Sequence, residues 1–185
     1  MINWINQIDR TTNELTKLFG SLTSKQLNWK PNPETWSIAQ NMDHIIVINQ
    51  SYFPILSDLK KGSYKLPFIA KIGFLVSILG KILLKAVNPD RRKKMKTFSI
   101  WEPSKREISD DILDKFKSHQ TELKQQIEGS EDLIKRGAII SSPANKYIVY
   151  KLETAFDIIV THEQRHLEQA KEILALLKLN TSSIR

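Results

Sequence analysis

Apolar positions recur through most of the chain at the three- and four-residue spacing of an amphipathic helix. This pattern predicts four long helices, over residues 3–19, 37–59, 109–128 and 154–179. Gly20 and Gly129 come directly after two of these apolar stripes, where glycine commonly ends a helix. Long helices without a partner sheet are typical of a four-helix bundle, so we expect an all-α fold.

Polar residues mark three of the helix starts. Thr23 with Gln26, and Ser37 with Gln40, each place a hydroxyl three residues before an amide side chain. In a capping box these two side chains satisfy backbone N–H groups that the first helical turn leaves unpaired. We therefore expect a short helical turn after Thr23 and a long helix that starts at Ser37. The residues around Thr154 predict a capped start for the last helix.

The length and composition of the chain fit one ordinary domain. Of its 185 residues, 41% are hydrophobic, which is enough to fill a core. We therefore assign residues 1–185 to a single helical domain. Residues 147–150 could be briefly extended, but one such segment forms no sheet, so no strand set is predicted.

The section between the second and third long helices, residues 60–107, has a different character. Its apolar stretch predicts an extra helix over residues 68–86. Lys71, Lys81 and Lys85 interrupt this stretch, and three lysines are hard to place in a membrane core that needs about 20 apolar residues. We interpret the section as a helical insert in the bundle and not as a membrane span.

The positive charge of the chain is concentrated in this insert. Residues 60–106 contain 13 basic and 2 acidic residues, a net charge of +11, whereas the whole chain carries +8. The rest of the chain is therefore slightly acidic, with a net charge of −3. The densest basic run is Arg91, Arg92, Lys93 and Lys94.

The basic segment also allows a non-catalytic function as the alternative to an enzyme. The protein would then be a binding module that uses its basic segment at phosphates, or at an anionic membrane surface as a peripheral protein. We favour a solvated loop beside an extra core or dimer-interface helix. No sequence motif predicts a nucleic-acid partner.

The absence of cysteine limits the chemistry. Disulfides, thiolate metal ligands and a cysteine nucleophile are all excluded, while a reducing compartment is permitted. The first residues, MINWINQIDR, contain no apolar run of the kind found in a signal peptide. A cytoplasmic location is therefore expected.

The last long helix carries histidines on its apolar face. At 100° per residue, one narrow sector contains Ala155, Ile159, His162, His166, Ile173 and Leu177. Gln169 lies on the same row. An unpaired buried polar group costs roughly 1–3 kcal/mol, so these polar side chains require partners.

A metal ion is one partner that satisfies two imidazoles at once. The i, i+4 spacing of His162 and His166 brings both rings to one side of the helix, within reach of one metal ion. Hydrogen bonds to neighbours in the bundle are the alternative, and for a pair in mid-stripe we favour the metal. The third ligand is either His44, on the second long helix, or His119, on the third. Their spacing does not separate the two.

Four segments carry a family resemblance. Residues 22–31 are followed by residues 35–45, which contain a Trp-Ser-Ile sequence that leads into a helix, with Trp36 eight residues before His44. The last helix reads His-Glu-Gln-Arg-His-Leu-Glu-Gln over residues 162–169. Together with residues 95–103, these segments resemble the DinB/YfiT-like superfamily of metalloenzymes, and all three histidine positions of its motifs are matched.

The resemblance implies a four-helix bundle, commonly dimeric, in which His44, His162 and His166 hold nickel or zinc at the base of a pocket. It also implies a thiol-dependent reaction, because some members transfer a thiol such as bacillithiol to electrophiles or isomerise a substrate with a thiol cofactor. Residues 66–96 look like a family-variable insert that shapes the pocket.

The chemistry of three imidazoles agrees with that implication. Three neutral rings leave a metal position open, which is typical of a catalytic and not of a structural zinc site. An open metal lowers the pKa of bound water or of a bound thiol and so generates a nucleophile. We therefore expect a metal-dependent S-transferase or hydrolase that acts on a small molecule, with a low-molecular-weight thiol taken from solution.

The sequence also allows an HExxH metallopeptidase, since Glu163 follows His162 directly. Only 19 residues follow His166, however, and residues 167–171 contain no glycine of the metzincin extension. Glu163 is either a base beside the metal or a solvated charge on the flank of the helix. Trp36 is expected to pack at the end of the bundle, with a place in the wall of a ligand pocket as the alternative.

Overall fold

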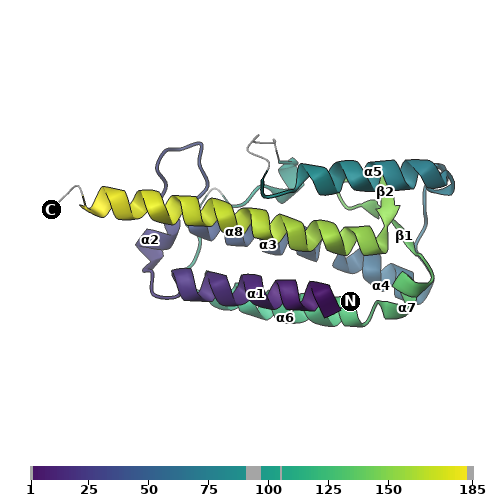
Figure 1. Ribbon diagram of the computed structural model, residues 1–185, viewed down its shortest axis with the longest axis horizontal. Coiled ribbons are helices and arrows are strands. Elements are labelled where there is room, and N and C mark those ends of the chain that lie inside the picture. Colours follow the sequence, from purple (N-terminus) through teal and green to yellow (C-terminus); the bar gives the residue numbers. More distant parts are fainter. Residues whose placement is uncertain (1, 91–96, 105, 183–185) are drawn as a thin grey trace.

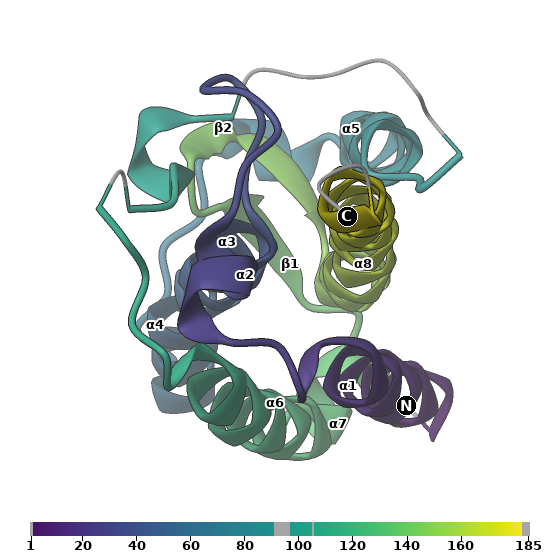
Figure 2. The same ribbon diagram turned by 90° about the vertical axis from the view of Figure 1, so that its left-hand side faces the viewer.

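The computed structural model describes residues 2–90, 97–104 and 106–182 and is mostly helical (Figure 1). Four helices form a bundle: α1 (Ile2–Phe19), α3 (Ile38–Gln50), α6 (Ile112–Glu128) and α8 (Leu152–Ser182). Seen end-on, each helix packs against two others, in the cyclic order α1, α6, α3, α8 (Figure 2). The prediction of an all-α bundle is confirmed.

Both predicted capping boxes are present. The Thr23 hydroxyl accepts from the backbone N–H of Gln26 and starts the short helix α2 (Ser24–Asn28). At the start of α3, the Ser37 backbone N–H donates to Oε1 of Gln40, and the Gln40 backbone N–H donates to the Ser37 hydroxyl, each at 3.1 Å. These caps fix the point at which the chain enters α3, and that helix carries His44.

The second long helix is interrupted, so the prediction of one helix over residues 37–59 is wrong. α3 ends at Gln50, and α4 (Phe53–Lys61) begins after a short turn. Pro54 lies in the first turn of α4, where its missing N–H is not needed; inside a continuous helix its ring would clash with the carbonyl of Gln50. The apolar stripe continues across the break because Tyr52 and Leu56 are both buried.

A small β-hairpin corrects the prediction that the chain contains no strand set. After α7 (Glu131–Lys135), strand β1 (Ile139–Ser142) pairs antiparallel with β2 (Asn145–Lys151), with a register shift between Ser141 and Ser142. β2 runs directly into α8, which starts at Leu152 and not at a cap on Thr154. The α8 start is fixed by the backbone instead, since the Leu152 N–H donates to the Ala138 carbonyl at 2.8 Å.

The insert forms an outer layer on α8 and the hairpin (Figures 1 and 2). Its predicted helix is divided into a 3-10 turn η1 (Phe68–Lys71) and α5 (Gly73–Ala86), and a second turn η2 (Ser99–Trp101) follows. Gly80 allows α5 to approach α8, because a Cβ there would lie 3.0 Å from Cγ2 of Thr154. The predicted basic run 91–94 lies outside the described residues.

Buried Arg165 of α8 fixes the end of α5. Its Nη1 donates to the carbonyl oxygens of Ala86 and Asn88, at 3.3 and 3.1 Å. Among the described residues, no helix is long and apolar enough to cross a membrane.

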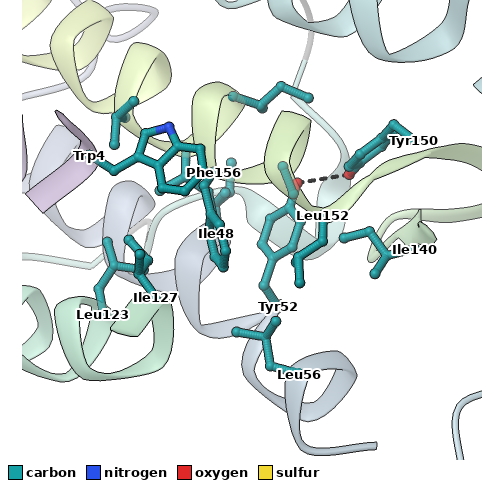
Figure 3. Close-up of a cluster of buried hydrophobic side chains, with 14 of the residues drawn as sticks. Trp4, Ile48, Tyr52, Leu56, Leu123, Ile127, Ile140, Tyr150, Leu152 and Phe156 are labelled. Carbon is teal, nitrogen blue, oxygen red and sulfur yellow. Dashed lines mark hydrogen bonds between the residues drawn. The ribbon is translucent and has the colours of Figure 1, made fainter. Parts of the chain in front are cut away.

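The core of the bundle contains two apolar clusters with polar side chains where they meet, and a third, small cluster joins α5 to the hairpin. One cluster lies toward the hairpin and contains Trp4, Ile48, Leu123 and Phe156, and Figure 3 shows it with the hydrogen bond between the Tyr52 and Tyr150 hydroxyls, 2.9 Å long. The other cluster lies toward the opposite end and contains Phe19, Met42, Phe116 and Leu167. Where the two clusters meet along the bundle helices lie the buried polar side chains that we call the middle layer: Thr11, His44, Asn49, His119, Gln120, Glu163 and His166.

Candidate metal centre

Three histidines from two helices converge within the middle layer. His44 comes from α3, and His162 and His166 come from successive turns of α8. One ring nitrogen of each lies within 4.8 Å of the other two, and the two Nε2 atoms on α8 are 3.0 Å apart. His44 and His166 are buried, whereas His162 keeps some exposed surface.

Carbonyl oxygens orient two of the rings. The Nδ1 of His44 lies 2.5 Å from the backbone carbonyl oxygen of Trp101, which can only accept, so Nδ1 carries the proton. The Nδ1 of His166 lies 2.7 Å from Oδ1 of Asn41. Asn41 uses its amide nitrogen to donate to the Ser37 carbonyl at 2.8 Å, which leaves its oxygen for His166. In both neutral rings Nε2 is then the unprotonated nitrogen, and such an outer partner is typical of metal-ligating histidines.

Burial keeps all three rings neutral. Desolvation lowers the pKa of His44 to about 4 and that of His162 to about 3. Desolvation also holds the pKa of His166 well below its ordinary value, and the neighbouring histidines and Arg165 add to this effect. Neutral imidazole is the form that binds a metal ion, so no proton has to be removed near neutral pH.

The donor set fits a divalent ion. With His44 and His166 both protonated on Nδ1, two unprotonated Nε2 atoms lie in one cluster, and the single N–H of a neutral His162 can donate to only one of them. Two nitrogens that bind one tetrahedral zinc at about 2.0–2.1 Å lie roughly 3.3 Å apart, close to the observed 3.0 Å. A cation that accepts all three lone pairs removes this conflict.

Trp36 lies against the cluster and not only at the end of the bundle. Its ring stacks on His166, with 5.9 Å between centroids and 17° between planes, and its centroid lies 4.7 Å from that of His44. The indole is half-buried. Trp36 therefore covers one side of the cluster with an apolar wall.

His119 lies away from the three converging histidines. Its ring stacks on Phe53 at 5.7 Å, and it lines a cavity of about 460 Å³ together with Asp43 and Gln50. Neither ring nitrogen has a hydrogen-bond partner among the described residues, and burial lowers the pKa of His119 to about 4. Of the two candidates for the third ligand, the structure thus brings His44, and not His119, to the pair on α8.

Glu163 is fully buried, so the interpretation as a solvated flank charge is wrong. Its Oε1 accepts from Nδ2 of Asn49 at 2.7 Å. Burial raises the pKa of Glu163 to about 7, and the amides of Gln120 and Asn49 oppose that rise. The carboxyl group is directed toward α3 and α6, where Asn49 and Gln120 form with it what we call the amide–carboxyl group.

Gln169 is half-buried one turn after His166 and acts to raise the pKa of that ring. The sequence interpretation missed Asn41, Asn49, Gln120 and the Trp101 carbonyl. The first three had a signal, since each is a polar residue within the apolar stripe of a long helix. The carbonyl had none, because it belongs to the backbone of the insert and its position depends on the tertiary fold.

Comparisons with known proteins agree with this arrangement. The model of the DinB superfamily matches residues 7–170, which include α3, α6, most of α1 and α8, and the three converging histidines. No curated protein and no solved structure matches the chain. Because the family model covers most of the sequence, the chain belongs to the DinB superfamily.

Proposed function

We propose that this protein is a metal-dependent enzyme that binds one divalent zinc or nickel ion through Nε2 of His44, His162 and His166. Its reaction would be S-transfer from a low-molecular-weight thiol, or hydrolysis, with a small-molecule substrate. One observation carries the proposal: three neutral imidazoles converge, two of them buried and with their outer nitrogens occupied by carbonyl oxygens.

The chain's own residues prepare the site for such an ion. Asn41 and the Trp101 carbonyl hold two rings at fixed tautomers, and Trp36 excludes water from one side of the cluster. With three protein ligands a metal keeps an open position, at which it lowers the pKa of a bound thiol or water. The chain has no cysteine, so the thiol of an S-transfer has to come from solution. A homodimer remains a prediction from the family resemblance.

The position of Glu163 counts against a peptidase. In an HExxH peptidase the glutamate acts as general base and must reach the metal-bound water. Here the Glu163 carboxyl binds Asn49 and faces Gln120 across the bundle. We therefore favour thiol transfer or small-molecule hydrolysis over peptidase activity.

The test uses untagged protein, because a histidine tag can itself bind nickel. Purified wild type, His162→Ala and His119→Ala are analysed for bound metal and then assayed with a chlorobimane-type electrophile plus thiol, with an ester and with a peptide. We expect wild type and His119→Ala to bind metal and to share one activity that His162→Ala lacks. His119 is the matched control because it is a buried histidine outside the cluster. Equal activity in all three proteins would refute the proposal.

A further inference from the structure

The outer face of α5 exposes a row of large apolar side chains. Phe74, Ile78 and Ile82 follow one another at four-residue spacing and are 66%, 47% and 58% exposed. The opposite face of the helix is buried, with Val76 against the hairpin and Gly80 against α8. Figure 2 shows α5 on the outside of the bundle, beside α8. The exposed fractions of the three side chains show that they face solvent.

The turn before α5 extends this apolar surface. Phe68 in η1 is 75% exposed, and η1 packs against α5. Nζ of Lys71 lies over the Phe68 ring, 5.5 Å from its centroid. Exposed apolar side chains scattered singly are ordinary, whereas a continuous helical row with a neighbouring aromatic ring marks an interaction surface.

The segment that forms this surface carries charge of one sign. Residues 60–89 contain six lysines and no acidic residue. Lys81 and Lys85 are exposed beside Ile78 and Ile82 on the same helical face. The elements that pack against α5 add exposed Lys146 and Lys151 from β2, and α8 carries the exposed acids Glu153 at its start and Glu168 and Glu172 farther along.

This charge argues against a second copy of the chain as the occupant. In a two-fold dimer the patch would meet itself, so the lysines of both copies would face one another. An anionic lipid surface supplies the opposite charge and also an apolar interior for the aromatic and aliphatic tips. We propose that the outer face of α5, with η1, docks this protein on an anionic membrane surface without spanning it.

The proposal is independent of the metal centre and is tested with the full-length protein. Binding to vesicles of phosphatidylcholine alone is compared with binding to vesicles of equal parts phosphatidylcholine and phosphatidylglycerol. We expect sedimentation with the mixed vesicles only, and a decline as salt is raised, because exposed charges are screened. Equal binding to both vesicles, or no binding to either, would overturn the proposal.

Two double variants localise the contact. Lys81→Glu with Lys85→Glu should weaken binding more than about 25-fold, since each lysine near such a surface contributes about fivefold. Phe74→Ser with Ile82→Ser should weaken it at least tenfold, because the apolar tips no longer leave water. All four positions are exposed, so the fold should survive, which circular dichroism verifies.

Matched controls keep the result specific. Lys17→Glu with Lys25→Glu changes the same charge on exposed positions outside the insert, and Leu176→Ser removes an exposed apolar side chain of α8. The controls should lose far less affinity than the two α5 variants. Equal losses would show that net charge or general hydrophobicity governs binding, and would overturn the assignment to α5. Light scattering that shows a dimer broken by Phe74→Ser with Ile82→Ser would assign the face to a second copy instead.

Discussion

The histidine cluster and the amide–carboxyl group share the middle layer of the bundle, yet they differ in how their polar atoms are satisfied. In the cluster, the outer nitrogens of His44 and His166 have carbonyl partners and their lone pairs converge, while Nδ1 of His162 has no partner among the described residues. In the amide–carboxyl group, Asn49 binds Glu163, while Oδ1 of Asn49, both polar atoms of Gln120 and Oε2 of Glu163 have no hydrogen-bond partner among the described residues.

The histidine cluster is therefore arranged as a set of metal ligands, whereas the amide–carboxyl group contains buried polar atoms that lower the stability of the fold. Outer partners that fix ring tautomers are what a metal site requires. Buried polar atoms without partners reduce stability by about 1–3 kcal/mol each unless water or another ligand satisfies them. We therefore expect changes in the first group to affect metal affinity, and changes in the second to affect folding stability.

The largest effect is expected for His162→Ala. Loss of an outer partner alone costs about 10–100-fold in metal affinity, so loss of a ligand should cost more than about 100-fold. Isothermal titration of the untagged, metal-free protein with zinc measures this. His119→Ala is the control and should bind zinc like wild type; a similar loss in both variants would mean that the cluster is not the binding site.

Glu163→Gln should stabilise the protein above pH 7 by about 2–3 kcal/mol. The folded-state pKa of Glu163 is raised to about 7 from 4.5, so its burial is costly once the unfolded chain is ionised. This cost grows as pH rises from about 4.5 to 7 and is complete above that range. Glutamine keeps the oxygen that accepts from Asn49. Urea unfolding at pH 8 and at pH 4.5 measures the difference, and an equal effect at both values would contradict the assignment.

Asn41→Leu should lower zinc affinity about 10–100-fold, because the His166 ring loses the oxygen that fixes its tautomer. Asn49→Leu is the matched control, since it removes an asparagine of similar burial on the same helix but in the amide–carboxyl group. Titration with zinc should separate the two variants. If Asn49→Leu lost as much affinity as Asn41→Leu, the two groups would not be functionally distinct.

Metal-free protein should lose stability as pH falls below about 6.5. Folded-state pKa values are lowered to about 4 for His44 and about 3 for His162, so the unfolded chain binds more protons within this window. Each such histidine contributes up to about 1.4 kcal/mol per pH unit until its folded pKa is reached. Bound zinc should raise the profile between pH 6.5 and 5 by a nearly constant amount, because the folded-state rings are already neutral there and zinc displaces no proton from them. Unfolding free energies at several pH values, with and without zinc, check this.

The smallest effect belongs to the apolar cluster beside the hairpin. Tyr52→Phe removes one partner of the hydroxyl pair in Figure 3 and should cost about 1 kcal/mol, with zinc affinity unchanged. Chemical unfolding measures it. A change in zinc affinity would show that this cluster and the metal centre are coupled.

The sequence predicted the elements that depend on local signals. Capping boxes at Thr23 and Ser37 and the stripes of the bundle helices are local, and the structure has them. The hairpin was missed because β1 has only four residues and includes Ser141 and Ser142, whose burial comes from packing and not from an apolar pattern. The interruption before Pro54 was missed because the apolar stripe passes across it.

Within the site, the pair on α8 was visible from its spacing. The choice between His44 and His119 was not, since both lie on interior-facing helical positions and only the packing of α3 against α8 decides which ring reaches the pair. The sequence placed Glu163 on the flank of the last helix, because the angular position of a residue on one helix takes no account of a neighbouring helix such as α6. In the bundle that flank faces Asn49 and Gln120 and is fully buried.

The most direct test of the account is X-ray absorption spectroscopy of untagged protein loaded with one equivalent of zinc or nickel. We predict three imidazole nitrogens in the metal shell, at about 2.0–2.1 Å for zinc, and the same spectrum for His119→Ala. A shell with fewer than three imidazoles, or a spectrum that changes in His119→Ala but not in His44→Ala, would contradict the assignment of His44, His162 and His166 as the metal centre.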